Sequence, residues 1–269
     1  MSGRGGSYHQ TGAEAEDEAA RLRRQAAAIW GRERDALLAA GLAAGQRLLE
    51  VGCGPGGVLE RVARDLGRAP VGVDLDPQLL VRARAAGPVA RADGAALPFA
   101  DGAFDFVLFR LVLRHAPRRA ELLREAARVV RPGGVVCAVD VDESATAFDP
   151  EPPAWPALKG ALAQSAVRRG GDPFVGRRLR RLLVEAGLVP TQTVALPVTT
   201  EDVPPAAFVE TMLAPAARTV DPDLLDPAAV RGAWDALREW CTGTAGFGYA
   251  LGWMAGARKP DDWATRART

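Results

Sequence analysis

Short apolar runs alternate regularly with helix-forming segments between residues 47 and 141. The runs Arg47–Val51, Pro70–Val73 and Phe104–Phe109 have the length and composition of buried strands. Strands separated by helical segments predict βαβ units and a mostly parallel sheet. Because the strands are continuously apolar, we expect helices on both faces of the sheet. The chain is therefore predicted to be a doubly wound α/β protein.

Glycine and proline punctuation delimits the other elements of this part. We expect strands at Val89–Ala92 and Val135–Val141 and helices at Ala13–Ala40, Gly57–Leu66, Pro77–Ala86 and Arg118–Val130.

After Val141 the pattern loosens, beginning with an acidic, proline-rich segment at 142–155 that we expect to be a loop. Three parts are predicted: an N-terminal segment with a lid helix (1–40), a ligand-binding core (41–145) and a C-terminal half (146–269). That half is expected to supply helices near 156–169, 176–186, 206–217 and 227–240, and strands near 191–196 and 246–257 of the same sheet.

Composition narrows the function classes. With 269 residues and a net charge of +1, the chain can bury a core but has no global field for nucleic acid or acidic membranes. Three scattered cysteines without a CxxC pair argue against a disulfide framework and a metal site. The first twenty residues lack the apolar stretch of a secretory signal. We expect a cytoplasmic protein without a metal, a nucleic-acid partner or a membrane; a homodimer is left open.

A glycine-rich loop, Gly52-Cys53-Gly54-Pro55-Gly56-Gly57, joins the first predicted strand to a helix. In this context glycines let the backbone turn sharply and let a ligand approach the helix N-terminus. The spacing is GxGxG, whereas dinucleotide-binding loops read GxGxxG, and Gly57 blurs the count. The loop alone does not choose the cofactor, and a plain tight turn is the alternative.

Asp74 ends the second predicted strand, about twenty residues after the loop. A carboxylate there is placed to accept hydrogen bonds from ribose hydroxyls. Asp76, before Pro77, is better explained as a helix N-cap. An adenosine-containing ligand is indicated, with NAD still open.

Asp93 follows the third predicted strand in ADGAALPFADGAFDFV. With EVGCGPG, VGVDLDP and LRHAPRRAELLREAARVVRPGG, this segment resembles the class I S-adenosylmethionine-dependent methyltransferases, particularly the group of the ubiquinone and menaquinone C-methyltransferases. The resemblance covers roughly residues 47–141, and DPFVGRRLRRLLVEAGL resembles a later helix of that group. It implies a Rossmann-like sheet of seven strands, one of them antiparallel, with a helical lid over the substrate.

The resemblance also implies roles for individual residues in binding S-adenosylmethionine. Asp93 would accept a hydrogen bond from the adenine amino group, and Asp74 would bind the ribose. Glu50 would bind at the amino-acid end of the cofactor. Glu50 suits the ammonium of a methionine tail and would repel a pyrophosphate. The implied cofactor-binding set is Tyr8, Glu50, Gly52, Cys53, Gly54, Asp74, Leu75, Asp93, Gly94, Ala95 and Arg110.

A general base is harder to identify. His115 lies after the fourth predicted strand, and the acidic loop places Asp140, Asp142 and Glu143 after the fifth. His115 and Asp142 are the predicted catalytic candidates, with structural or solvated roles as their alternatives.

The expected reaction is methyl transfer to a small-molecule acceptor, with C- or O-methylation favoured, in a setting such as secondary metabolism. Two other classes stay open: an enzyme that binds S-adenosylmethionine without methylating, and an NAD-dependent oxidoreductase, which Glu50 and Asp93 oppose. The arginines at 177, 178, 180 and 181 are predicted to lie on a solvated helix face, since no aromatic residues are interleaved with them.

Overall fold

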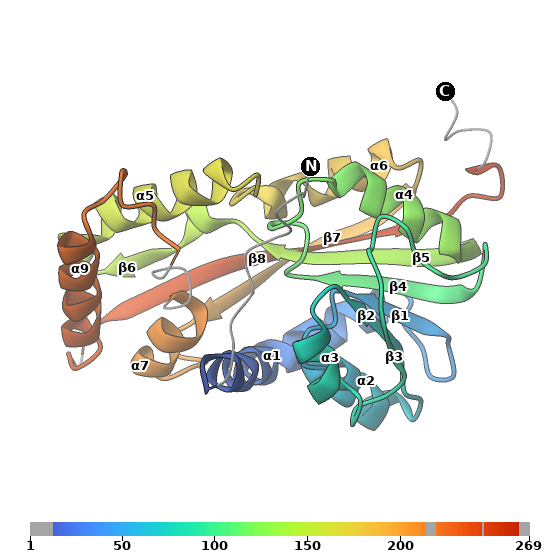
Figure 1. Ribbon diagram of the computed structural model, residues 1–269, viewed down its shortest axis with the longest axis horizontal. Helices are drawn as coiled ribbons and strands as arrows, with labels where there is room; N and C mark the ends of the chain where they lie inside the picture. The colour runs from blue at the N-terminus through green and yellow to red at the C-terminus, as the bar shows by residue number, and fades with distance from the viewer. Residues whose placement is uncertain (1–12, 214–218, 244, 264–269) are drawn as a thin grey trace.

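The computed structural model describes residues 13–213, 219–243 and 245–263. Their central feature is an eight-stranded sheet with the order β3-β2-β1-β4-β5-β8-β6, in which β7 also pairs with β8 (Figure 1). The first five strands pair in parallel, which confirms the predicted βαβ architecture. The strands are β1 (Leu48–Val51), β2 (Val71–Asp74), β3 (Val89–Arg91), β4 (Phe104–Arg110), β5 (Val130–Val141), β6 (Ala147–Asp149), β7 (Val189–Thr199) and β8 (Phe247–Arg258).

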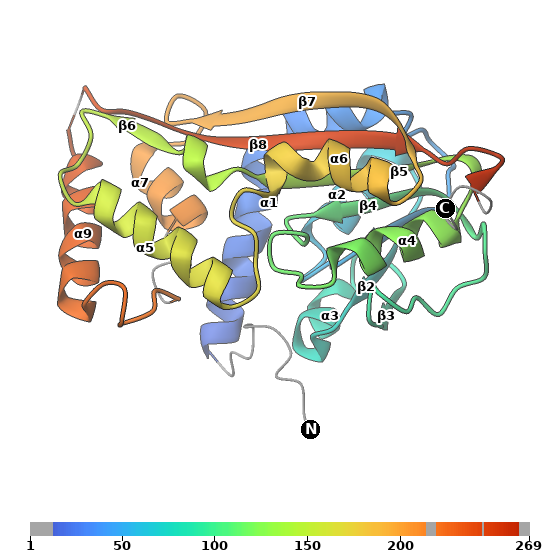
Figure 2. The ribbon, with the colours of Figure 1, turned by 90° about the horizontal axis from the view of Figure 1, so that it is seen from above.

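Helices cover both faces of the sheet, with α1, α2 and α3 on one side and α4, α5 and α6 on the other (Figures 1 and 2). The α1 side is packed by residues such as Trp30, Leu37 and Phe106, and the α4 side by residues such as Leu123 and Leu179. The helices are α1 (Ala13–Ala39), α2 (Gly57–Leu66), α3 (Pro77–Ala83), α4 (Arg119–Val129), α5 (Trp155–Arg168), α6 (Leu179–Glu185), α7 (Pro205–Phe208) and α9 (Pro227–Trp240), with 3₁₀ turns η1 (Glu143–Ala145) and η2 (Val175–Arg178) and the π-helical segment η3 (Val209–Leu213).

Strand β8 links two parts of the molecule. Its C-terminal half runs antiparallel between β5 and β7, with Val139 opposite Met254 and Met254 opposite Val194. Its N-terminal half runs past the end of β5 and pairs with β6 on that side. Helices α5, α7 and α9 surround this extension (Figures 1 and 2) and bury a separate apolar cluster that includes Phe148 and Trp234.

Local signals set most element boundaries. Asp76 caps α3 by accepting a hydrogen bond from the Gln78 amide, as predicted. Helix α2 begins at Gly57 and ends before Gly67, which has φ +70°. The predicted antiparallel strand is β8.

Two predictions after Val141 need correction. The acidic segment expected to be only a loop contains the short strand β6, so the sheet has eight strands and not seven. The helix expected at 206–217 is a single turn, α7, followed by π-helical Val209–Leu213, and its last predicted residues lie outside the described ones. In both segments, pairing and packing partners that are distant in sequence decide the local structure.

Candidate active site

The glycine loop forms an open cradle at the carboxyl edge of the parallel strands. The amides of Gly52 and Cys53 both donate to the Val73 carbonyl, at 2.8 and 3.0 Å, which ties the loop to β2. Gly52 has φ +76° and a Cβ there would collide with Val112, so packing requires this glycine. Gly54 has φ +53°, yet a Cβ on it would meet nothing within 4 Å. The space above Gly54 is therefore free for a ligand to approach the backbone.

Asp74 is held by the backbone at the end of β2. Its Oδ2 accepts a hydrogen bond from the Gly54 amide at 2.8 Å, and its Oδ1 accepts one from the Asp76 amide at 2.9 Å. Burial raises the pKa of the Asp74 carboxyl, against these hydrogen bonds. The neighbouring Leu75 side chain is 59% exposed. A fixed carboxylate with remaining lone pairs beside an exposed apolar surface can accept ribose hydroxyls and support a flat base.

Asp93 lies at the end of β3 on the same edge. One of its oxygens accepts a hydrogen bond from the Ala95 amide at 2.9 Å, and the other forms an ion pair with Arg118. The pKa of Asp93 lies below its ordinary value, mainly because of the hydrogen bond from the Ala95 amide and also because of Arg118. Gly94 is buried, and a Cβ there would lie 2.8 Å from Val51. Asp93 therefore stays ionised at neutral pH as an acceptor, and Arg118 is a partner that the sequence did not reveal.

A buried group of charged side chains lies beside the glycine loop, on the α1 face of the sheet. Glu50 of β1 and Arg110 of β4 project from neighbouring parallel strands, and Glu33 of α1 packs over them. The Arg110 Nε donates to both oxygens of Glu33, at 3.0 and 2.9 Å, and both side chains are less than one-tenth exposed. Burial removes most of the hydration of this ion pair. The two charges are therefore stable only if hydrogen bonds and neighbouring charges replace the lost water.

Two atoms of this group lack a hydrogen-bond partner among the described residues: Glu50 Oε2 and Arg110 Nη2, both fully buried. Burial raises the pKa of Glu50 to about 8, while Arg110 acts in the opposite direction. An acceptor and a donor left unpaired in one buried place are costly unless a ligand satisfies them. Together they match the ammonium and the carboxylate of an amino acid, so the residues present fit a methionine tail.

Two members of the implied cofactor set need comment. Cys53 is buried, packs with Leu59 and Leu80, and faces Gly72 inside the core. Burial also raises the pKa of its thiol. Its side chain is therefore directed away from the open edge, which leaves only its backbone for a ligand. Tyr8 lies outside the described residues.

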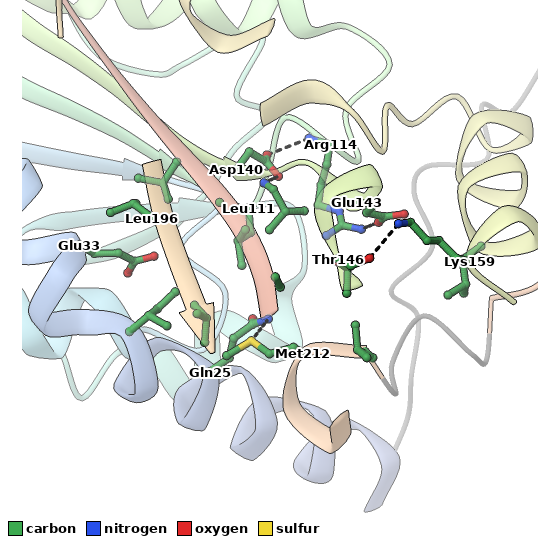
Figure 3. Close-up of a pocket in the computed structure, with 18 of the residues that line it drawn as sticks. Gln25, Glu33, Leu111, Arg114, Asp140, Glu143, Thr146, Lys159, Leu196 and Met212 are labelled. Atoms are coloured by element: carbon green, nitrogen blue, oxygen red, sulfur yellow. Dashed lines mark hydrogen bonds and ion pairs between the residues drawn. The ribbon is translucent and has the colours of Figure 1, made fainter. Parts of the chain in front are cut away.

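A cavity adjoins the charged group, between the sheet, α1, α5 and η3 (Figure 3). Its empty space is about 890 Å³, counted out to its open mouth. Leu111, the residue after Arg110, lines it with φ +56°, a left-handed conformation that costs energy in leucine and is typical of functional sites. The apolar wall is formed by Ile29, Leu111, Val139, Val141, Trp155, Leu162, Leu196, Val198, Met212, Leu213 and Ala250.

Polar side chains enter this cavity from several elements (Figure 3). Arg114 forms an ion pair with Glu143 of η1. Asp140, at the end of β5, is 1% exposed and accepts hydrogen bonds from the amides of Arg114 and Val141, at 3.0 and 2.9 Å. Burial raises the pKa of Asp140 to about 6, with Arg114 opposing it. Asp140 is therefore a buried proton acceptor on the wall of the cavity.

The two predicted catalytic candidates are placed elsewhere. Asp142 does not line the cavity; it caps η1 through Ser144 and forms an ion pair with Arg177. Its pKa is lowered by Arg177 and Ser144 against the effect of burial. His115 is solvent-exposed and is likewise not among the residues that line the cavity. Of the three acidic residues Asp140, Asp142 and Glu143, the first and the last line the cavity.

Sequence reasoning missed Glu33, Lys159 and Trp155, which all line the cavity. Glu33 and Trp155 lie in ordinary helical patterns that carry no local signal. Lys159 had one, because only two of the 34 basic residues are lysines. Within the described parts of the chain, no helix is long and apolar enough to cross a membrane, and no group of three or more metal-binding side chains occurs.

The predicted solvated face of α6 is confirmed. The arginines at 177 and 178 of η2 and at 180 and 181 of α6 are exposed, while Leu179 and Leu183 are fully buried. This pattern is that of an amphipathic surface helix.

The fold and the site define a class: a Rossmann-like α/β protein with a glycine cradle, carboxylates at the ends of β2 and β3, and a buried group of charged side chains with two polar atoms unpartnered among the described residues. Residues 49–138 match the family described as "Methyltransferase domain". Residues 49–138 are therefore similar to a methyltransferase domain, and S-adenosylmethionine is the cofactor of the class I methyltransferases that have this fold.

Individual proteins agree with this assignment. The chain is 45% identical over 101 residues to an uncharacterized methyltransferase of Mycobacterium avium, covering 35% of this chain and 38% of that one. It is 37% identical over 102 residues to 2-methyl-6-phytyl-1,4-hydroquinone methyltransferase of Synechocystis, covering 36% and 32%. The crystal structure of a putative sarcosine dimethylglycine methyltransferase from Galdieria sulphuraria has a TM-score of 0.54 at 18% identity, covering 94% and 92%, and shares the fold.

The matched part spans less than half the length of the curated relatives. The likeness is concentrated in the cofactor-binding strands, whereas most of the cavity wall lies after residue 138.

Proposed function

We propose that the protein transfers the methyl group of S-adenosylmethionine to a carbon or oxygen of a small-molecule acceptor that binds in the cavity. The observation that carries the proposal is the pair of buried, unpartnered atoms, Glu50 Oε2 and Arg110 Nη2, at the root of the glycine loop and next to the cavity. When bound, S-adenosylmethionine supplies an electrophilic methyl group and leaves as a neutral thioether. The similarity to a hydroquinone methyltransferase supports an acceptor of this kind.

The chain's own residues have distinct tasks in this proposal. Glu50 and Arg110 hold the amino-acid tail, and Asp74 and Asp93 hold the adenosine. The apolar walls exclude water, so that positioning of the two reactants contributes about 7–11 kcal/mol in favourable cases. Asp140 accepts the proton of the acceptor, because it is the buried carboxylate of the cavity that forms no ion pair with an arginine or lysine of the described residues.

The first test is calorimetric titration of the full chain with S-adenosylhomocysteine and with NAD. We expect S-adenosylhomocysteine to bind and NAD not to bind. Binding of NAD alone would refute the proposal. Transfer of labelled methyl from S-adenosylmethionine to a pool of small phenols, hydroxy acids and quinols then tests the reaction; cofactor binding without transfer to any of them would favour the non-methylating alternative.

The second test separates the carboxylates. Asp140→Asn is expected to keep its affinity for S-adenosylhomocysteine and to lose about 10²–10⁴-fold in transfer rate, the usual contribution of a general base. Asp142→Asn is the matched control, two residues away and outside the cavity. A large loss of rate in Asp142→Asn with normal Asp140→Asn kinetics would instead support the sequence-based candidate.

A further inference from the structure

Helix α5 presents one face to the cavity. Trp155, Lys159 and Leu162 all line the cavity, at positions i, i+4 and i+7 of the helix. Residues at this spacing project from the same side of a helix. The first two carry hydrogen-bond donors and no acceptor. Helix α5 therefore contributes two donor-bearing side chains and one apolar side chain to the cavity wall.

Neither donor is fully used by the protein. The Lys159 ammonium donates to the carbonyls of Ser144 and Thr146, at 2.7 and 2.8 Å, which leaves one of its three hydrogens. The Trp155 side chain is 2% exposed, and its Nε1 has no hydrogen-bond partner among the described residues. Buried donors of this kind usually have a partner. An acceptor group of a ligand in the cavity would take the remaining hydrogen of Lys159.

Comparison with the other lysine sharpens this point. Lys259 also donates to two carbonyls, those of Arg128 and Val130, at 3.1 and 2.8 Å. Its ammonium in addition lies 4.7 Å from the centre of the Trp263 ring, so an aromatic face covers it. Lys159 likewise donates to two carbonyls, but it lines the cavity. A compact ammonium fits such a pair of carbonyls, where a planar guanidinium would not.

The other charges of the cavity define an orientation. Glu33 already pairs with Arg110, and Glu143 pairs with Arg114. Either glutamate would have to break its ion pair with the arginine in order to bind a cationic ligand. Figure 3 shows Glu33 and Lys159 on opposite sides of the cavity. The side near Glu33 and Leu111 adjoins the cofactor residues, and the α5 side carries the donors.

We propose, resting on the methyltransferase function above, that the acceptor is an amphipathic organic acid. Its carboxylate binds Lys159 and Trp155 of α5, its apolar body lies along the cavity wall, and its methyl-accepting end lies toward Leu111 and Asp140. Recognition of the carboxylate at one end fixes which end of the molecule meets the cofactor.

The test uses three probes with one apolar body: octanoate, octanol and octylamine. Each is titrated calorimetrically into the full chain with and without S-adenosylhomocysteine. We expect octanoate to bind about tenfold or more tightly than octanol, as for a charge-assisted hydrogen bond, and octylamine to bind no better than octanol. Equal affinities for octanoate and octanol, preferential binding of octylamine, or no binding of any probe would overturn the proposal.

Variants locate the effect. Lys159→Met is expected to weaken octanoate about tenfold or more while leaving octanol and S-adenosylhomocysteine unchanged, and Trp155→Phe to weaken octanoate about threefold. Arg168→Met is the matched control, because it removes a positive charge from the same helix at an exposed position outside the cavity. An equal loss of octanoate affinity in Arg168→Met would show that the net charge of the protein, and not a site at Lys159, causes the effect. This outcome would refute the site.

The two proposals fail in different ways. A protein that selects octanoate through Lys159 but does not bind S-adenosylhomocysteine would keep the carboxylate site and lose the methyltransferase function. One that binds S-adenosylhomocysteine but does not distinguish the probes would do the reverse. If Lys159→Met does not fold, the probe series on the unaltered chain and on Trp155→Phe still decides.

Discussion

The cofactor side and the acceptor side of this protein position their polar groups by different means. On the cofactor side, Asp74 and Asp93 accept hydrogen bonds from amides within two residues or in the adjoining loop. On the acceptor side, Lys159 of α5 donates to the carbonyls of Ser144 and Thr146, and Glu33 of α1 links this side to Arg110 across 77 residues. The carboxylates of the cofactor side follow strand ends and glycines that the sequence marks, whereas the contacts of Lys159 and Glu33 exist only when their helices have packed. The following predictions test that difference.

The largest expected effect is on the long-range buried pair. Glu33→Ala leaves the Arg110 guanidinium buried without its partner, and removing one member of such a pair costs about 3–5 kcal/mol in the free energy of unfolding. Urea titration measures this value. The double variant Glu33→Ala/Arg110→Met should recover part of the loss, since no uncompensated charge remains. A loss below about 1 kcal/mol in the single variant would show that the pair behaves as an exposed one.

The next effect concerns a local carboxylate. Asp74→Ala is expected to lower the affinity for S-adenosylhomocysteine by about 100-fold or more, because the charged ribose acceptor and the anchor of the Gly54 amide are lost together. Asp76→Ala is its control: it removes the α3 cap at a cost of about 1 kcal/mol in stability but leaves the ribose acceptor in place. Near-normal affinity in Asp74→Ala, measured by calorimetry, would remove the ribose assignment.

Glu50 makes cofactor binding depend on pH. The ligand ammonium needs an ionised Glu50, whose pKa in the free protein is about 8, so binding at lower pH must release a proton. We expect the affinity for S-adenosylhomocysteine to rise as the pH increases from about 6 to 8, by up to about tenfold per pH unit. Titrations in buffers of different ionisation enthalpy measure the released proton, and Glu50→Gln should abolish it. Binding that is independent of pH and buffer would contradict a raised pKa.

The stability of the ligand-free protein has the opposite dependence. Because the pKa of Glu50 is raised above its ordinary value of 4.5, the folded state holds this proton more tightly than the unfolded state. The free energy of unfolding should therefore fall as the pH rises from about 4.5 to 8, and Asp140 adds to the decline between its ordinary value of 3.8 and about pH 6. Urea titration at several pH values checks the sign, and Glu50→Gln should flatten the upper part of the curve.

The smallest effect is expected on the solvated face of α6. Arg180→Ala should change the free energy of unfolding by less than about 0.5 kcal/mol, since the side chain is exposed. Neither probe binding nor cofactor affinity should change. A clear loss of either would mean that this arginine face has a function that its exposure does not suggest.

The sequence alone determined the parallel core and its cofactor-binding edge. Apolar strands, helix-capping residues and glycines with left-handed backbone are local features, so the places of Gly54, Asp74 and Asp93 at one edge of the sheet could be predicted. Even there, the direction of a side chain was not local: Cys53 faces the core because Gly72 on the next strand leaves room for it.

Only the tertiary structure decided the acceptor side. Strand β6 forms because the overhanging half of β8 offers it a partner, and the cavity forms because residues of α1, α5 and η3 line one space together with β5, β7 and β8. Asp140 and Asp142 are two residues apart in one acidic segment, yet the first lines the cavity and the second is paired with Arg177 outside it. Such roles depend on contacts between residues far apart in the chain, and these contacts arise only when the chain has packed, which is why Glu33, Trp155 and Lys159 carried no role in the sequence.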